Sequence, residues 1–580
     1  MKQILFISII SLLLLSSCND DFLELPPTTK LGESIEFFET KTALETYTNS
    51  FYNYFDRSEI LNDFYSDNCE HIGSPPPIRR GVYTIPTALG SGGWSWTQLR
   101  NINYFLDMCS KSKLSSDDKN PYIALARFFR AKFYFEKVKT FGDVPWYSRP
   151  LNTNDDELYK ARDTRTMVMD SLLADLDFAI DYLPVAKSKN KITKWTALAL
   201  KSRICLYEGT WRKYHTEVSL TKVNDLLSDC VDASKQIMDA GVYTLYSTGN
   251  PNRDYFELFQ PTNAYTEEVI LARSAAEGNY FYYTPNFTST SNGNYGATYS
   301  LVSSYLMKNG QAVNPDLPDT TCYFDEFQNK DPRLAQSILY PGYIRVGTTT
   351  KAVTDFAENR TGYQIIKRVG PPIEDQGGDT RDAIMFRYAE VLLNYAEAKA
   401  ELGSITQEDI DQSINLIRSR VALPPLTLPV AVDDVLDAMY LNTSDPIILE
   451  IRRERRNELA FEGFRRDDIK RWAEGHLFRS KQEGIYITGI HKFIDLDNDG
   501  NPDLYVLLST ETVPSNKVPG VQYFKLSDVN GLSNGTKGRI IPFNSTLPAF
   551  QNWEYLSPIP TEELTLNPKL EQNPGWDELY

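Results

Sequence analysis

The sequence predicts a mainly α fold, a tetratricopeptide-like scaffold of paired helices with a loop-rich, partly β appendage near the C-terminus. Apolar residues recur every three or four positions in several segments, which indicates amphipathic helices. Alanine-rich helical cores repeat along the chain, which favours stacked helix pairs, although the period is irregular. Short β-type runs lie between turn residues near the C-terminus and predict the appendage.

The first element in chain order is an export signal over residues 1–17. It begins with Lys2, continues with an apolar run, and ends in small residues before Cys18, as a bacterial lipoprotein signal does. We expect cleavage to leave Cys18 as a lipidated N-terminus on a tether over 18–30. The apolar run is shorter than the roughly 20 residues of a spanning helix, so we expect an anchor and not a membrane span. The alternative is an ordinary cleaved signal with an incidental cysteine.

Three helical segments can be placed from their residues. Regular apolar spacing predicts a helix over 167–183. Alternating alanine and phenylalanine predict another over 121–140, which Gly142 ends. A similar alanine-rich core lies at 395–398, and Leu402 with Gly403 forms its predicted helix end. These segments are the members of the predicted helix pairs.

The chain has 580 residues, more than one hydrophobic core usually holds. We expect an N-terminal helical region over 31–245 and a C-terminal region over 246–580. The loop-rich appendage is predicted inside the second region at about 480–555, where runs such as 504–508 alternate with turn residues.

The charge and the cysteines exclude several classes of function. A formal net charge of −17 repels phosphate backbones and anionic headgroups. We therefore expect no nucleic-acid partner, no membrane contact beyond a lipid, and a neutral ligand. Besides Cys18 the chain has an odd number of cysteines without C-x-x-C spacing, so it predicts neither a disulfide framework nor a zinc site.

The most charged segment is 447–472. Glutamates at 450, 454, 458 and 462 are spaced four residues apart, so they are predicted to line one helical face beside four arginines. A carboxyl pair at once suggests glycoside hydrolysis, which needs one protonated carboxyl group as general acid. Surrounding guanidinium groups would instead hold every carboxylate ionised. The pattern therefore predicts a structural salt-bridge network.

The same segment carries a family resemblance. Residues 454–463, followed by Arg465, Asp468, Lys470, Arg471 and Trp472, resemble the hallmark of the SusD/RagB family of outer-membrane nutrient-binding lipoproteins. Further matches to the family span nearly the whole chain, at 99–106, 129–131, 141–145, 331–333, 386–393, 555–560 and 572–576.

The resemblance implies a cell-surface protein that is anchored to the outer membrane by its lipid. It would form a lid on a SusC-like TonB-dependent transporter, capture an oligosaccharide or similar nutrient, and deliver it for import. No catalysis is expected, and none of the four histidines lies in a nucleophile motif. A peptide-binding, glycopeptide-binding or adhesive surface lipoprotein remains the alternative function.

The family motifs do not locate the ligand, so the site is predicted from aromatic residues, on which the flat faces of sugars stack. We expect two glycines, at 92 and 93, to expose Trp94 and Trp96, and the resemblance also implies a sugar platform in this region. The alternative for Trp96 is that it packs into the core at the start of the next helix.

A second predicted group lies elsewhere in the sequence. Residues 279–300 are rich in tyrosine, asparagine and glycine without a helical pattern, which predicts a long functional loop. Its candidate stacking residues are Tyr282, Tyr283 and Tyr295. The candidate hydrogen-bonding partners for sugar hydroxyls, from neighbouring loops, are Asp67, Arg79 and Arg80.

A final motif predicts a structural calcium ion. Asp495, Asp497, Asp499 and Asp503 occupy positions one, three, five and nine of a calcium loop, with a glycine at the turn. Position twelve is Val506 and not glutamate, so the motif is not an EF-hand. The same residues also form ordinary turns, which is the alternative.

Overall fold

The computed structural model describes residues 35–55, 58–71, 73, 75–274, 295–313, 322–374, 381–543 and 547–577. The predicted signal, Cys18 and the tether lie outside the described residues, as do Tyr282 and Tyr283. Within these ranges, no helix combines the length and apolar character that a membrane crossing requires.

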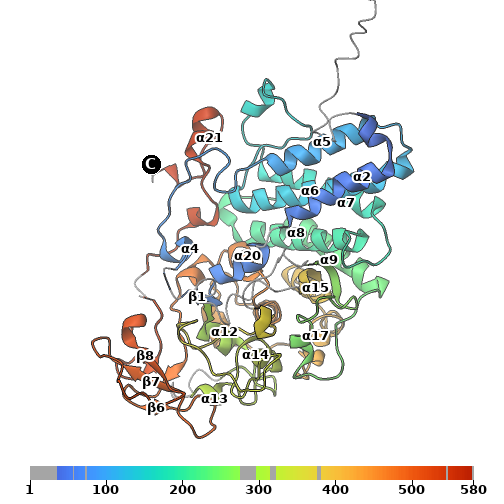
Figure 1. Cartoon of the computed structure of the whole chain (residues 1–580). Helices are drawn as coiled ribbons and strands as arrows, with labels where there is room; N and C mark the ends of the chain where they lie inside the picture. The colour runs from blue at the N-terminus through green and yellow to red at the C-terminus, as the bar shows by residue number, and fades with distance from the viewer. Residues whose placement is uncertain are drawn as a thin grey trace, which may run out of the picture.

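A stack of long helices forms one side of the molecule (Figure 1). Successive members contact one another in the order α5, α6, α7, α8, α9 and α15, and α2 packs on α6. Their apolar faces enclose the main hydrophobic core. The predicted mainly α, paired-helix scaffold is thereby confirmed. The bounds are α2 (Lys41–Asn49), α5 (Thr97–Lys111), α6 (Ser116–Phe141), α7 (Arg165–Tyr182), α8 (Lys194–Tyr214), α9 (Val223–Ala240) and α15 (Tyr388–Glu401).

The predicted start of α6 is wrong by five residues. The helix begins at Ser116, because the Ser115 hydroxyl accepts a hydrogen bond from the Asp118 amide at 3.2 Å and caps it. Pro121 lies in the second turn and does not mark the start. The predicted end of α15 is confirmed, since Gly403 follows Leu402 with a left-handed φ of +66°.

Shorter helices connect the long ones and build the rest of the chain. The α-helices are α3 (Ser58–Leu61), α4 (Pro77–Arg80), α10 (Asp254–Glu257), α12 (Tyr299–Ser304), α13 (Tyr323–Glu326), α14 (Pro332–Ser337), α16 (Gln407–Asp411), α17 (Ile414–Arg420), α18 (Asp434–Met439), α19 (Pro446–Glu458), α20 (Arg465–Arg471) and α21 (Thr561–Leu566). Short 3-10 helices span Ile35–Glu39, Ser50–Tyr54, Asn62–Tyr65, Asp156–Tyr159, Thr216–Val218, Pro372–Glu374, Gly475–Arg479, Leu526–Asp528 and Asn552–Tyr555.

The strands form small sheets. Antiparallel pairs join β1 (Cys69–His71) to β3 (Tyr295–Ala297), β2 (Val269–Arg273) to β4 (Ala383–Arg387), and β5 (Tyr486–Ile487) to β9 (Gly538–Arg539). In the predicted appendage, β7 (Leu504–Leu507) pairs antiparallel with β6 (Phe493–Ile494) and parallel with β8 (Gln522–Lys525). This sheet lies at the lower left of Figure 1, away from the helical stack, and its apolar residues belong to a second core that β3, α12 and α14 share. The partly β character of the appendage is confirmed.

The predicted loop at 279–300 does not extend to its last residues. Tyr295–Ala297 form β3, and Tyr299 begins α12. The central position of β3 must be a glycine, because a Cβ on Gly296 would lie 2.1 Å from the Thr361 hydroxyl oxygen. Close contact with Thr361 and pairing with β1 therefore order a segment whose composition is typical of loops.

The charged segment forms a buried ion-pair network, as predicted. Glu450, Glu454 and Glu458 lie on α19, whereas Glu462 lies beyond its end, because the helix stops at Glu458. Left-handed backbone at Phe461 then returns Glu462 to the same cluster of arginines. Each carboxylate is buried against cations from other elements, at the closest distances Glu450–Arg418 2.5 Å, Glu454–Arg333 2.6 Å, Glu458–Arg420 2.5 Å, Glu458–Arg387 2.7 Å, Glu462–Arg387 2.7 Å and Glu462–Lys367 2.7 Å.

The arginines decide the protonation state of these carboxyl groups. Burial alone would raise their pKa, but the neighbouring guanidinium groups hold the pKa of Glu454 and Glu458 below the usual range. Although burial is the largest influence on Glu462 and works to raise its pKa, Arg387 and Lys367 together bring that pKa down to about 2. Glu454, Glu458 and Glu462 are therefore ionised at neutral pH.

The variant Glu458→Gln tests the network. It removes the negative charge that Arg333, Arg387 and Arg420 share, so it leaves three buried cations underneutralised. We expect a loss of about 3–5 kcal/mol in the free energy of unfolding, measured by urea denaturation. Glu45→Gln is the matched control, because its pair with Lys191 is exposed and worth at most about 1 kcal/mol. Equal losses of stability in the two variants would contradict the assignment of Glu458 to a buried ion-pair network.

Stability is also expected to fall in acid. Charge pairing lowers the pKa of Asp67 and of Glu462 to about 2 in the folded chain, against roughly 4 in the unfolded chain. The unfolded state therefore binds more protons as pH falls from about 4 to 2, and stability is lost in that window. Burial raises the pKa of Asp63 to about 6, which acts in the opposite direction between pH 6 and 4.

Between pH 6 and 2.5, the urea midpoint, measured at constant ionic strength, is thus expected to be highest near pH 4–5 and to drop steeply below pH 4. A midpoint that stays constant from pH 4.5 to 2.5 would contradict this expectation.

Candidate functional site

A cavity of about 530 Å³ lies beside α5, and its volume is within the roughly 300–1,000 Å³ of small-molecule sites. Three segments enclose it: the loop that leads into α5, the chain between α6 and α7, and α21 with the residues after it. The lining side chains that matter below are Trp96, Arg100, Asn103, Tyr147, Arg149, Tyr159 and Glu563.

The cavity combines aromatic rings with polar groups. Trp96 meets Tyr147 edge to face at 5.5 Å between ring centroids, and Tyr159 is 41% exposed at the rim. Arg100 and Arg149 bring guanidinium groups to the same wall, whereas the buried Asn103 amide donates to the carbonyls of Tyr147 and Arg149. Aromatic faces beside guanidinium groups suit a ligand with flat apolar faces and many hydroxyl groups.

Lys137 of α6 holds the loop that carries Trp96. Its ammonium group donates hydrogen bonds to the carbonyl of Gly93 and, at 2.7 Å, to that of Ser95. It also lies 5.2 Å from the Trp96 ring centroid, a cation–π distance. Burial lowers the pKa of Lys137 to about 7.

The C-terminal segment holds the same loop from the other side. The Gly90 amide donates to a Glu563 carboxylate oxygen at 2.7 Å, and the Thr561 amide donates to the Pro86 carbonyl at 3.1 Å. Residues more than 450 positions apart in the sequence thus fix one binding loop between them.

The expectation that Trp94 is exposed is wrong. Gly92 and Gly93 both have positive φ, +58° and +91°, and the turn that they make directs Trp94 inward. Its ring packs edge to face on Phe141 at 4.8 Å and is only 2% exposed, although it reaches the inner wall of the cavity. Trp96 is the more accessible of the two, so the predicted roles of the tryptophans are exchanged.

Asp67 and Arg79 are structural in this fold and not available to a ligand. Asp67 is buried between Arg465 at 2.7 Å and Arg456 at 3.1 Å. Arg79 is buried against Glu70 at 2.7 Å and donates to the carbonyl of Phe478. Both expectations of ligand contact are therefore wrong, because the polar atoms of each side chain already form ion pairs or hydrogen bonds with other parts of the chain. Arg80 is half-buried and does not belong to the wall of the 530 Å³ cavity.

Tyr295 lies in the small β1–β3 sheet. Its ring stacks on Phe64 at 4.7 Å and meets His71 edge to face at 4.7 Å. Its core cluster is separate from the one that holds the tryptophans. Of the described residues predicted for the site, the structure therefore brings together only Trp94 and Trp96. Sequence reasoning missed Tyr147 and Tyr159, which could have been found as aromatics in a turn-rich segment.

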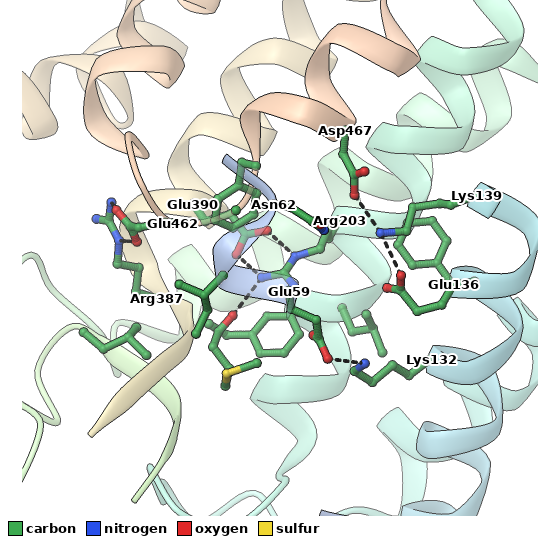
Figure 2. Close-up of a pocket in the computed structure, with 18 residues that line it drawn as sticks. Glu59, Asn62, Lys132, Glu136, Lys139, Arg203, Arg387, Glu390, Glu462 and Asp467 are labelled. Carbon is green, nitrogen blue, oxygen red and sulfur yellow. Dashed lines mark hydrogen bonds and ion pairs between the residues drawn. The ribbon is translucent and has the colours of Figure 1, made fainter. Parts of the chain in front are cut away.

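A much smaller cavity, of about 60 Å³, lies between the helical stack and β4 (Figure 2). Figure 2 shows its wall of ion pairs: Glu59–Lys132 at 2.8 Å, Arg203–Glu390 at 2.6 Å and Lys139–Asp467 at 2.6 Å. The volume has room for about two water molecules at roughly 30 Å³ each, not for a sugar. This cavity is therefore a small gap, lined by ion pairs, between packed elements.

The predicted calcium loop joins β6 to β7, without helices on either side. Asp495, Asp497 and Asp503 each place an oxygen within 4.8 Å of the others. Asp499 instead accepts a hydrogen bond from the Asn501 amide at 2.8 Å and is exposed.

One Asp497 oxygen is buried without a hydrogen-bond partner among the described residues. Burial and the neighbouring carboxylates raise the pKa of Asp497 and Asp503. Three of the four carboxylates thus fit a calcium ion, and calcium binding itself stays a prediction.

Calcium is expected to stabilise this appendage. With a dissociation constant of about 1 mM, 10 mM Ca²⁺ would add about 1.4 kcal/mol of stability over a chelator-treated sample, seen as a raised Tm. Asp497→Asn is expected to abolish the increase and Asp499→Asn to retain it. A Tm that does not respond to Ca²⁺ would identify the segment as an ordinary turn.

Comparison with known proteins shows one consistent set of similarities. A model of the SusD family matches residues 258–576, and a model described as starch-binding and associating with the outer membrane matches 93–206. The SusD-like protein P38 of Formosa agariphila is 23% identical over 502 residues, which cover 81% of this chain and 91% of that protein. A SusD-like protein of Bacteroides ovatus is 25% identical over 47% of this chain and 50% of its own length.

Solved structures show the same fold. A SusD-like protein from Bacteroides fragilis superposes with a TM-score of 0.69 at 21% identity, over 93% of this chain and 98% of that chain. A SusD-like carbohydrate-binding protein from the same species gives a TM-score of 0.68 at 24% identity, over 92% of this chain and 100% of that chain.

Proposed function

The chain belongs to the SusD family, and we propose that it is a surface receptor that binds an oligosaccharide in the cavity beside Trp96 and hands it to a SusC-like TonB-dependent transporter. The observation that carries the proposal is the 530 Å³ cavity with Trp96, Tyr147 and Tyr159 in its wall. Relatives described as starch-binding or carbohydrate-binding support the choice of ligand class.

Binding is proposed to occur without cleavage. Glycoside hydrolysis requires two carboxyl groups on either side of the scissile bond. Among the described residues, Glu563 is the only carboxylate in the wall of the cavity, and it accepts the Gly90 amide. The glutamates of the α19 network are ionised and buried, so they supply no general acid.

The membrane attachment follows from the sequence. We propose that Cys18 carries the lipid and that the described residues face outward from the outer membrane. The transporter would then receive the ligand from a protein tethered beside it, which raises the effective concentration of the captured sugar at the transporter.

A binding screen with the chain from residue 19 to 580 tests the proposal. We expect at least one soluble oligosaccharide to bind, with its length unchanged after incubation. Trp96→Ala is expected to weaken that binding about tenfold or more, because a lost aromatic contact in a desolvated site is worth about 1–2 kcal/mol. Isothermal titration calorimetry measures the affinity and chromatography measures the length of the sugar.

Tyr182→Ala is the matched control, since Tyr182 is 44% exposed on α7 and lies outside the cavity. Shortened sugar would establish an enzyme. Binding of peptides or glycopeptides alone would support the alternative of a peptide or glycopeptide receptor. Equal sugar binding by the Trp96 and Tyr182 variants would show that the sugar binds outside the cavity beside Trp96.

A further inference from the structure

A second cavity, of about 310 Å³, adjoins the one beside Trp96. The same loop lines both, with Tyr83, Pro86 and Gly92 facing the second cavity and Leu89, Ser95 and Trp96 the first. The C-terminal segment also contributes to both, through Ser557 and Glu563 respectively. The two cavities therefore share one loop and one C-terminal segment in their walls.

Two cations line this second cavity without a carboxylate partner. Arg466, which is half-buried, makes no hydrogen bond or ion pair with any residue that the structure describes, and its Nε is buried. Lys470 is only 6% exposed, and its ammonium group donates a hydrogen bond to the carbonyl of Tyr555 at 2.7 Å. Burial and the nearby positive charge of Arg466 lower the pKa of Lys470 to about 7.

The acidic groups near these cations are already paired elsewhere. Glu554 lines the cavity, but it accepts the Tyr83 hydroxyl at 2.5 Å and pairs with Arg479. Asp467 follows Arg466 on α20, but Figure 2 shows it directed to Lys139, at 2.6 Å. Among the described residues, Arg466 and Lys470 thus make no ion pair with a carboxylate, although Asp467 acts on both electrostatically.

This arrangement differs from that of the arginines that contact α19. Arg333, Arg387, Arg418 and Arg420 all have carboxylate partners, as buried charges normally do. A buried polar group without a partner costs about 1–3 kcal/mol, so a ligand that supplies the missing acceptor is strongly favoured. Arginine offers a planar pair of donors that matches a carboxylate or a sulfate ester.

We propose that the second cavity binds the anionic group of an acidic saccharide, a carboxylate or a sulfate ester, while neighbouring sugar rings contact Trp96. Tyr65, which is 39% exposed at the same wall, offers an aromatic surface next to the anion. The inference rests on the proposed function and narrows its ligand class. It replaces the neutral ligand expected from the net charge of −17, because distant surface charges are screened beyond about 8–10 Å in physiological salt.

The test uses pairs of oligosaccharides that differ only in charge. One pair is oligogalacturonate and its methyl ester, and the other is a sulfated carrageenan oligosaccharide and its desulfated form. For at least one pair, we expect the charged member to bind the chain about tenfold or more tightly than its neutral counterpart. The pair that shows the preference identifies the anionic group as carboxylate or sulfate.

Arg466→Gln is expected to remove this preference and to leave binding of the neutral member unchanged, whereas Trp96→Ala weakens both members. Lys470→Met is a second variant with the same expected effect as Arg466→Gln, and it serves if Arg466→Gln folds poorly. The Tm of each variant shows whether it is folded. Arg253→Gln is the matched control, because Arg253 is an exposed arginine paired with Glu257.

Equal affinity within both pairs, or an equal loss for both members in Arg466→Gln, would overturn the inference and leave the proposed receptor function intact. Failure of every charged and neutral oligosaccharide to bind would overturn both.

Discussion

The column of ionised glutamates that begins on α19 is the interaction on which the rest of the fold depends. Buried carboxylates are tolerated only when cations reach them, and here the cations come from α14, from the end of β4 and from α17. Each of these elements is thereby held at one distance and orientation from α19. Arg455 and Arg471 extend the network to Asp468 and, through Glu397, to α15, so the helical stack is joined to it as well. Such a network gives specificity of arrangement more than net stability, because desolvation cancels much of the attraction.

The sequence was sufficient for features set by local spacing. The helix pairs follow from apolar periodicity, and the ion-pair network follows from glutamates four residues apart beside arginines. The site could be predicted only in part, because distant residues complete it. Whether Trp94 or Trp96 is buried depends on Phe141 and on two left-handed glycines, and Asp67 finds its partner Arg465 nearly 400 positions away. No local pattern encodes such contacts.

Net charge alone does not determine the local chemistry of the cavities. The acidic total of the chain counts many glutamates and aspartates that are already neutralised by buried arginines or lie far from any cavity. What a ligand meets is set by the few groups within a Debye length, and these include Arg100 and Arg149 in one cavity and Arg466 in the other. A protein can therefore be acidic as a whole and still present cations where a ligand lies.

The contact between the loop before α5 and the segment around α21 has a consequence for biogenesis. The loop is synthesised well before its C-terminal partner, so Gly90 and Pro86 meet Glu563 and Thr561 only once the end of the chain has been made. A chain that has not yet docked its C-terminal segment lacks one wall of the 530 Å³ cavity, because Glu563 and Leu570 belong to that wall. The cavity beside Trp96 is therefore among the last parts of the molecule that can be completed.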